Sequence, residues 1–375
     1  MFFFKLSAFY FFYFAAVGVY IIFLPKVLLD IGYSPSDIGI ILALAPLMRF
    51  ATPFLFLKHI KLDRKVFTIS LIISIISASL FYVTIDNFYL FIINNGILGI
   101  CLSLVLPYIE TIALIKLGKE KYGKSRLYGS IGFMLVALVL AKFLHTPQVA
   151  LHYYLVITIL TALFSFLLLK YDVVHENTTK KKSKPFSMLK YWPFWLSLFL
   201  MQVSFGGFYN FFTIYETSHG ISLEMTSYLW SFGVVCEIFM LYFQAPILKN
   251  NLLTIIKFSI FITAIRWLLL YLFADSLTIT FITQAIHAFS FGLYHSAVIL
   301  CLYSLYKDKK LAQQFMFGVA YGLGGFTGAI ISGWLYSDEL FLYSAIFAFL
   351  SFISLMLLKK RSSKRPKKAA SYSLR

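Results

Sequence analysis

Long uninterrupted apolar runs recur along the whole chain and limit the folds open to it. Each run holds roughly 18–25 residues, which as a helix rising 1.5 Å per residue crosses a hydrocarbon core about 30 Å thick. Because lipid offers the backbone no hydrogen-bond partner, helices are the natural spanning form for such runs. A transmembrane barrel would show segments of roughly ten residues with alternating polarity, and these runs are continuous instead. We therefore predict an all-α polytopic membrane protein.

Twelve transmembrane helices are expected. Their predicted limits are 6–29, 37–57, 66–84, 88–115, 127–145, 149–170, 192–216, 224–247, 252–273, 277–303, 311–334 and 340–358. The opening run MFFFKLSAFYFF resembles a signal sequence but continues past a normal h-region, and no convincing A-x-A cleavage site follows it. We expect it to remain as the first helix.

The positive charges indicate an orientation. With an even number of spans, all but four of the 33 Lys and Arg residues fall on one side of the membrane; the exceptions are Lys26 and Lys142 on the other side, and Arg49 and Arg266 within spans. Positive residues near helix ends are held on the cytoplasmic side. We therefore expect both termini in the cytoplasm and the chain in the inner (plasma) membrane. The net charge of +18 is then topological, and no nucleic-acid partner is expected.

The longest polar interruption covers residues 170–192 and separates six spans from six. Two equal bundles joined by a basic loop are typical of transporters. We predict an N-terminal six-helix bundle (1–171), a cytoplasmic central loop (172–190), a C-terminal six-helix bundle (191–358) and a basic cytoplasmic tail (359–375). Glycines in the fifth helix of each half, at 129–132 and at 318–328, predict close helix packing at matching places.

Ionisable side chains inside the spans are few, and each is costly to place there. Glu237, Arg266 and His287 fall at similar depths in the eighth, ninth and tenth helices, and His295 follows in the tenth. A low dielectric favours the neutral carboxylic acid and a nearby arginine favours the carboxylate, so movement of the arginine would shift the balance. We predict proton coupling by these four residues. The alternatives are a structural Glu237–Arg266 ion pair and histidines that only pack between helices.

Five further polar residues are expected to bind substrate. Arg49 lies in the second helix and Glu110 in the fourth, so they either pair with each other or leave Arg49 as a bidentate donor to an anion. Snorkelling of either side chain to the inner surface is the structural alternative. Gln202, Tyr209 and Asn210 in the seventh helix are expected to line the same cavity.

Several motifs resemble the phenylpropionate permease family, a lactose-permease-like branch of the major facilitator superfamily. The more specific ones are YGKSRLYGSIGF (122–133) and YLWSFGVVCEI (228–238), accompanied by PLMRF (46–50), IRW (265–267) and QAIHAFSFGLYH (284–295). The resemblance implies a proton symporter, with Arg49, Glu237, Arg266, His287 and His295 at matching positions. Glu110 stands where the family's fourth helix is expected to carry an Asp.

Two features depart from that family. The superfamily signature after the second helix is degraded in HIKLDRKV, which keeps Asp63 and Arg64 but lacks the glycines. Glu216 near the outer end of the seventh helix is an unexpected carboxylate, and it leaves the substrate preference open.

We predict a secondary active transporter, a proton symporter of a small organic solute such as the aromatic carboxylate 3-phenylpropionate, working by alternating access. The alternatives are a proton-coupled sugar or nucleoside carrier, an antiporter-type exporter, and a membrane receptor or scaffold without transport activity. Solute, protons and lipid are the expected partners of a monomer.

An enzyme is not expected. The sequence has no HExxH, no GxSxG and no phosphate-binding glycine loop at a helix start. His287 and His295 would lie about 80° and about 12 Å apart on a straight α-helix, too far for a shared metal. Neither metal nor cofactor is predicted.

Overall fold

The computed structural model describes residues 1–58, 62–172 and 187–358. Every regular element among them is helical, which confirms the predicted fold class. The first half contains α1 (Phe2–Gly18), the π-helical η1 (Val19–Phe23), α2 (Leu24–Asp30), α3 (Pro35–Lys58), α4 (Arg64–Thr84), α5 (Phe88–Phe143), α6 (Pro147–Leu168) and η2 (Leu169–Tyr171).

The second half has more breaks. It contains η3 (Leu189–Tyr191), α7 (Trp192–Ser204), α8 (Gly206–Ser218), α9 (Leu223–Phe243), η4 (Ile247–Lys249), α10 (Leu252–Leu272), α11 (Leu277–His287), the π-helical η5 (Ala288–Leu293), α12 (Tyr294–Leu305), α13 (Lys309–Met316), the π-helical η6 (Phe317–Gly324), α14 (Gly325–Trp334) and α15 (Leu340–Met356).

The observed helices follow the predicted spans with two differences. Within the described residues, ten helices are long and apolar enough to cross a membrane, and α15 is a shorter apolar helix at the twelfth predicted position. The seventh predicted span, 192–216, is two helices, α7 and α8, that meet at Phe205. Gly206 and Gly207 follow the break, and adjacent glycines are a common cause of sharp kinks.

Helix α5 reverses direction within its length. Tyr122 Oη donates to Glu110 Oε1 over 3.0 Å, whereas twelve residues of straight helix would rise about 18 Å. The chain therefore folds back between them, and α5 consists of a first arm, Phe88–Leu117, and a second arm, Lys121–Phe143. These arms are the predicted fourth and fifth spans.

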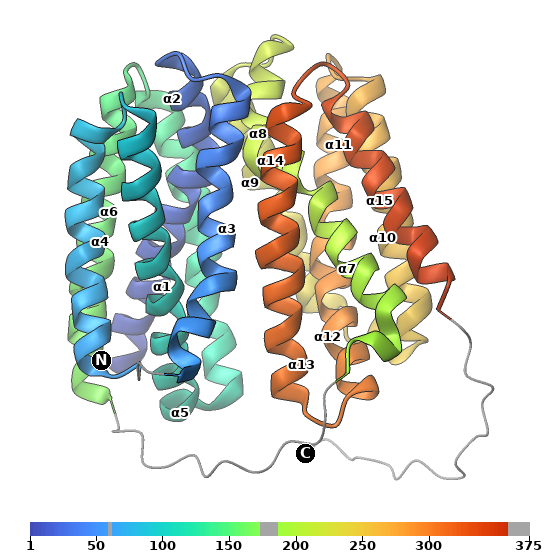
Figure 1. Cartoon of the computed structure of the whole chain (residues 1–375), viewed down its shortest axis with the longest axis horizontal. Coiled ribbons are helices and arrows are strands. Elements are labelled where there is room, and N and C mark those ends of the chain that lie inside the picture. Colours follow the sequence, from blue (N-terminus) through green and yellow to red (C-terminus); the bar gives the residue numbers. More distant parts are fainter. Residues whose placement is uncertain (59–61, 173–186, 359–375) are drawn as a thin grey trace.

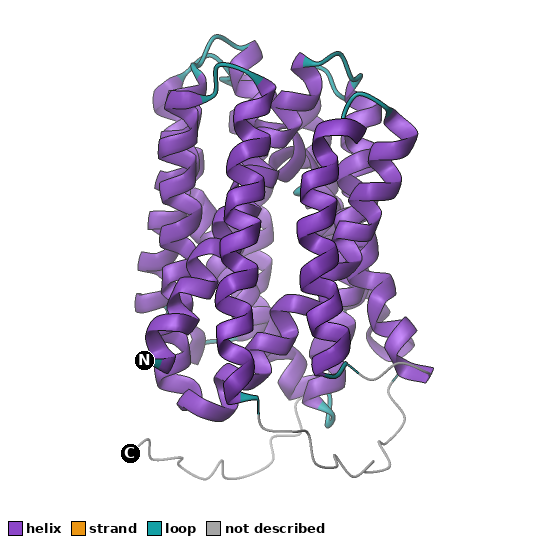
Figure 2. Ribbon diagram, turned by 90° about the vertical axis from the view of Figure 1, so that its left-hand side faces the viewer, coloured by secondary structure: helices purple, strands orange, loops and turns teal. Residues whose placement is uncertain are grey.

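The helices form two groups that stand side by side (Figure 1), with α1–α6 in one and α7–α15 in the other. Helix α1 begins and α15 ends at the same end of the molecule, here called the terminal face (Figures 1 and 2). The connections at 31–34, 85–87, 219–222 and 335–339 lie at the other end, the opposite face. Residues 173–186 of the predicted central loop and the predicted tail, 359–375, lie outside the described residues.

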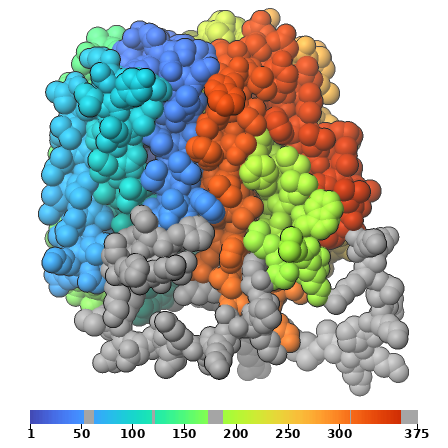
Figure 3. Space-filling view, viewed as in Figure 1, coloured from blue at the N-terminus to red at the C-terminus, as the bar shows by residue number. Residues whose placement is uncertain are grey.

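The two halves meet along α3 and α14, whose side chains join on the face seen in Figure 3. Near the opposite face this contact depends on small residues: a Cβ on Gly39 would lie 2.7 Å from the Ala329 carbonyl oxygen and 3.0 Å from Gly333 Cα. On another side, Lys142 Nζ of α5 lies 3.7 Å from Glu224 Oε1 of α9. The halves are therefore in contact near the opposite face.

The predicted glycine contacts are present in both halves. A Cβ on Gly132 of α5 would lie 2.0 Å from the Phe11 carbonyl oxygen of α1, and a Cβ on Gly328 of α14 would lie 2.9 Å from the Val203 carbonyl oxygen of α7. Glycine permits these backbones to approach, as is typical of membrane helix packing. The fifth helix of each half thus packs closely on the first.

Replacing Gly132 with Ala should destabilise the first half, because the added methyl group would overlap the α1 backbone. Overpacking of this kind costs about 1–3 kcal/mol. We expect a lower thermal unfolding temperature in detergent, while Gly123→Ala serves as the control because nothing lies within 4 Å of its added Cβ. Equal unfolding temperatures for the two variants would contradict the close α1–α5 contact.

Candidate functional site

Arg266 of α10 is completely buried in the second half. Its Nη1 lies 2.9 Å from His287 Nδ1, and its Nη2 donates to Gln284 Oε1 over 3.3 Å. The guanidinium also lies over the rings of Phe208 and Trp267, each with its centroid 4.3 Å away. Cation–π contacts and charge-assisted hydrogen bonds offset part of the cost of this buried cation. The side chain is therefore held in one place.

His287 connects Arg266 to Glu237 of α9. Because the arginine donates to Nδ1, that nitrogen is the acceptor and the imidazole proton belongs on Nε2. Nε2 lies 3.8 Å from Glu237 Oε2, just outside hydrogen-bond range. Among the described residues, Glu237 and Arg266 form no direct ion pair, so the structural pair considered from the sequence is wrong. The arrangement is a row: Arg266, His287, Glu237.

His295 lies beyond this row, behind Phe291. The Phe291 ring stacks on His287 (centroids 5.4 Å apart) and on His295 (6.1 Å apart). The π-helical η5 lies between the two histidines, and its wider turn brings the three rings into line, unlike the separation of about 80° expected on a straight α-helix. His295 Nδ1 lies 2.6 Å from Tyr321 Oη of η6.

Glu110 of the first half pairs with Arg126, a residue not predicted for the site. Arg126 Nη1 donates to Glu110 Oε1, and it also donates to Tyr122 Oη over 2.8 Å. Of the two alternatives left open by the sequence, the pairing of Glu110 with Arg49 is therefore not the one found among the described residues. The predicted fifth span began at residue 127 and so excluded Arg126, whereas the structure places Arg126 in the second arm of α5. The spacing of Tyr122 and Arg126, four residues apart on one helical face, was the available signal.

Arg49 of α3 is exposed and has no hydrogen bond or ion pair within the part of the chain that the structure describes. It lies within electrostatic range of Tyr13 and Tyr20 in the first half and of Tyr321 in the second. Its guanidinium therefore faces the space between the halves, with its donors free.

The polar groups of the two halves converge. Arg126 lies within electrostatic range of Glu237 and His295, and Tyr321 lies within range of both Arg49 and Glu237. The central site, as the term is used below, consists of Arg49, Glu110, Arg126, Glu237, Arg266, His287, His295 and Tyr321. It combines the unpaired Arg49, the Glu110–Arg126 ion pair and the row of Arg266, His287 and Glu237.

A family model described as the MFS_1 like family matches residues 3–351. The chain belongs to this family. It is thus a transporter of the major facilitator type rather than an enzyme. The probable 3-phenylpropionic acid transporter of Escherichia coli (strain K12) is 22% identical over 345 residues, which cover 87% of this chain and 89% of that protein. The resemblance to the phenylpropionate permeases is therefore confirmed.

Solved structures of other transporters share the fold. The nucleoside transporter NupG matches with a TM-score of 0.75 and 15% identity, covering 96% of this chain and 100% of that chain. The POT family transporter PepTSo matches with a TM-score of 0.69 and 10% identity, covering 95% and 96%. At these identities the likeness concerns the fold alone.

The three residues of the seventh predicted span that were expected to line a substrate cavity differ from one another in their surroundings. Gln202 is buried and borders a small cavity of about 10 Å³ together with His295 and Tyr321. Tyr209 is half-buried and lies within electrostatic range of Glu237. Asn210 donates to the Gly206 carbonyl oxygen of its own helix over 2.8 Å, so that donor is already engaged.

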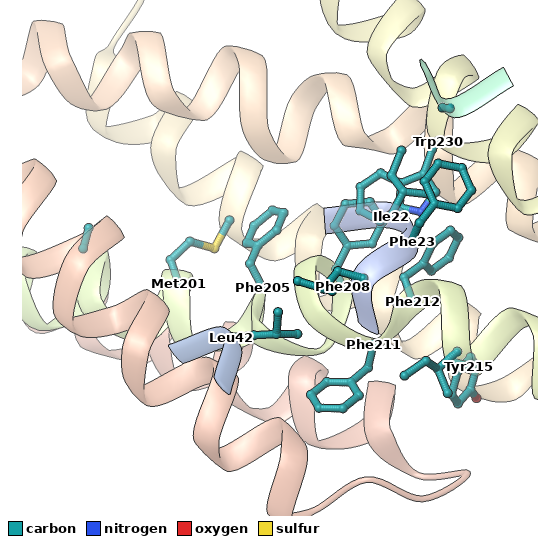
Figure 4. Packing of buried hydrophobic residues seen from close by; sticks show 14 of the residues in the cluster. Ile22, Phe23, Leu42, Met201, Phe205, Phe208, Phe211, Phe212, Tyr215 and Trp230 are labelled. Carbon is teal, nitrogen blue, oxygen red and sulfur yellow. The ribbon is translucent and has the colours of Figure 1, made fainter. Parts of the chain in front are cut away.

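An apolar layer lies between the central site and the opposite face. It consists of Ile22, Phe23, Phe208, Phe212 and Trp230, all buried, and is called the aromatic plug below (Figure 4). Ile22 and Phe23 follow Tyr13 and Tyr20, the two tyrosines within electrostatic range of Arg49, toward the opposite face. Trp230 precedes Glu237 in α9, so the plug is nearer that face.

Two charged side chains of the central site are partly exposed. The exposed fraction is 44% for the Arg126 side chain and 22% for the Glu237 side chain. Because all members of the plug are buried, an apolar layer separates these partly exposed groups from the opposite face.

Proposed function

We propose that this transporter is a proton symporter that carries a small organic anion, such as 3-phenylpropionate, by alternating access. The observation that supports it most directly is the placement of two groups around one space. Arg49 in the first half has free donors, and Glu237 in the second half can hold a proton. The named activity of the Escherichia coli relative supports the choice of an aromatic carboxylate.

The geometry suggests how binding of the anion and binding of the proton depend on each other. A carboxylate bound to Arg49 as a bidentate partner would place a negative charge in the space that Glu237 faces. Neighbouring like charges oppose one another, so the anion favours the protonated form of Glu237. Anion and proton therefore bind most readily together, which is the requirement for symport.

The row behind Glu237 supplies the opposing influence. Arg266 is a fixed positive charge, and neutral His287 stands between it and Glu237. Arg126 adds a second positive charge within electrostatic range. In the absence of solute these cations favour the carboxylate form and release of the proton. Movement of the halves against each other changes the distance between Arg126 and Glu237 and so alters this balance.

The driving force follows from the charges. One proton moving with one monoanion carries no net charge, so the pH gradient alone drives it, at about 1.36 kcal/mol per pH unit or about tenfold accumulation. A second proton would add a response to voltage of about 2.3 kcal/mol per 100 mV.

We also propose the inner membrane as the location, with the terminal face and both termini in the cytoplasm. The strong bias of Lys and Arg toward that face supports this orientation. Residues 1–171 and 191–358 are proposed as the two bodies that move against each other, with 172–190 as their connection, in a monomer.

Uptake into proteoliposomes tests the proposal. The panel is 3-phenylpropionate, a sugar and a nucleoside, each with and without an imposed pH gradient. We expect saturable, gradient-driven accumulation of 3-phenylpropionate in the alkaline compartment. Since neutral aromatic acids cross bilayers unaided, protein-free liposomes give the baseline to be subtracted.

Other outcomes of this experiment would contradict the proposal. Accumulation of only the nucleoside or the sugar would favour the neutral-solute carrier, and accumulation in the acidic compartment would indicate an antiporter. Saturable flux that ignores the gradient would indicate a facilitator. No flux of any kind, although the folded protein is present, would also contradict it.

A further inference from the structure

A second carboxylate, Glu216, is buried outside the central site. Its side chain in α8 has no exposed surface, and neither of its carboxylate oxygens has a hydrogen-bond partner among the described residues. It lies seven residues, about two helical turns, beyond Tyr209 toward the opposite face. A buried and unpaired carboxylate is strongly disfavoured, whereas the neutral acid costs far less. In this environment the group holds a proton.

Glu216 lies on a helix that contacts both halves. Helix α8 packs against η1 and α2 of the first half and against α14 of its own half. Glu216 is one turn beyond Phe212, a member of the aromatic plug, on the side of the opposite face. The helix that carries the buried Glu216 therefore takes part in a contact between the halves that alternating access must break.

None of the charged groups on the surrounding helices neutralises Glu216. The charged residues on elements packed against α8 are Lys26 and Asp30 on α2 and Glu224 and Glu237 on α9. Lys26 is paired with Asp30, and Glu224 lies 3.7 Å from Lys142. The other titratable groups on these elements are Tyr20 on η1, Tyr228, Cys236 and Tyr242 on α9 and Tyr343 on α15, while α7 and α14 carry none.

The titratable neighbours along the chain are also engaged elsewhere. Tyr215 Oη donates to the Asp338 carbonyl oxygen over 3.1 Å, and His219 Nδ1 lies 2.8 Å from the Tyr215 carbonyl oxygen. Tyr209, two turns away, lies within electrostatic range of Glu237 instead. The described surroundings of Glu216 thus contain no cation bonded to it, and a proton is the ligand that fits.

We propose that Glu216 is a second proton-binding site, which holds its proton while the opposite face is closed and exchanges it with solvent when that face opens. The inference rests on the alternating access of the proposed function, but not on the solute or on proton coupling at Glu237. The closed form then carries one proton more than the open form. Raising the pH favours opening, by up to about tenfold in the open-to-closed ratio per pH unit.

Infrared spectroscopy of the purified protein in lipid tests whether Glu216 holds a proton. At neutral pH without solute, we expect the wild type to show the carbonyl band of a buried carboxylic acid and Glu216→Gln to lose it. Glu224→Gln is the matched control, because its acid lies at the same end of the molecule with an exposed side chain. An unchanged carboxylic-acid region in Glu216→Gln would overturn the proposal. Glu237 is present in wild type, Glu216→Gln and Glu224→Gln, so its contribution to the spectrum is the same in all three and does not affect the comparison.

Distance measurements test the link to opening. Spin labels at Asp86→Cys and Asp275→Cys would report the separation of the two halves at the opposite face, in a chain with Cys236→Ser. In wild type we expect the separated population to grow as pH rises. Glu216→Gln mimics the protonated acid and should stay closed, losing this response.

Two comparisons keep the distance test decisive. A thermal unfolding temperature near wild type would show that Glu216→Gln is folded. Glu237→Gln should keep the pH response of the opposite face even if it transports nothing, which separates this proposal from the proposed function. An identical pH response in wild type and Glu216→Gln would overturn it.

Discussion

Glu237→Gln should abolish proton-driven accumulation of solute while leaving exchange of solute across the membrane largely intact. Glutamine has nearly the same size as the protonated acid, but it can neither take up nor release a proton. Wild type should accumulate a monoanion about tenfold per pH unit of gradient, and the variant should only equalise the concentrations. Accumulation under an imposed gradient and counterflow exchange in proteoliposomes measure the two activities separately.

Glu224→Gln is the control for this variant. It removes a partly exposed carboxylate at the opposite face, outside the central site, and should accumulate solute as wild type does. Concentrative uptake by Glu237→Gln at the wild-type ratio would show that the proton is carried elsewhere.

Arg49→Gln should weaken the binding of an anionic solute by about 10- to 100-fold. A hydrogen bond to a charged group contributes about 1.5–3 kcal/mol, and Arg49 is the cation at the site that is free of protein partners in the described chain. Arg49→Lys should recover only part of the affinity, because lysine keeps the charge but not the bidentate geometry. Concentration dependence of uptake measures the change.

The specificity of this effect provides its control. Arg64→Gln, on an exposed arginine at the start of α4, should bind as wild type does. A neutral analogue, 3-phenylpropanol, lacks the carboxylate that Arg49 would bind. It should therefore bind with the same affinity to wild type, Arg49→Gln and Arg64→Gln. If Arg49→Gln keeps wild-type affinity for the anion, Arg49 has only a surface role.

The sequence predicted the spanning helices well because membrane thickness sets a length that apolar runs reveal directly. The break between α7 and α8 was missed, although Gly206 and Gly207 mark it: the apolar run continues across the break, and hydropathy does not register a kink. The π-helical segments were invisible for the same reason. Only the structure shows that η5 brings His287, Phe291 and His295 into one line.

The central site was predictable in part. Glu237, Arg266 and His287 stand out because ionisable groups inside a membrane are rare, and their convergence follows from the packing of α9, α10 and α11. Arg126 was not predicted as a site residue because it follows several lysines near a helix end, and positive charges there indicate only which side of the membrane they lie on. Its pairing with Glu110 depends on the reversal within α5, which brings together residues sixteen positions apart.

The measurement that tests this account most directly is proton movement caused by solute movement. Proteoliposomes would hold a pH-sensitive dye and start without a pH gradient, and 3-phenylpropionate would be added outside. We predict acidification of the lumen in excess of protein-free liposomes for wild type, and loss of that excess for Glu237→Gln. Saturable entry of solute through wild type without any excess acidification would contradict the account.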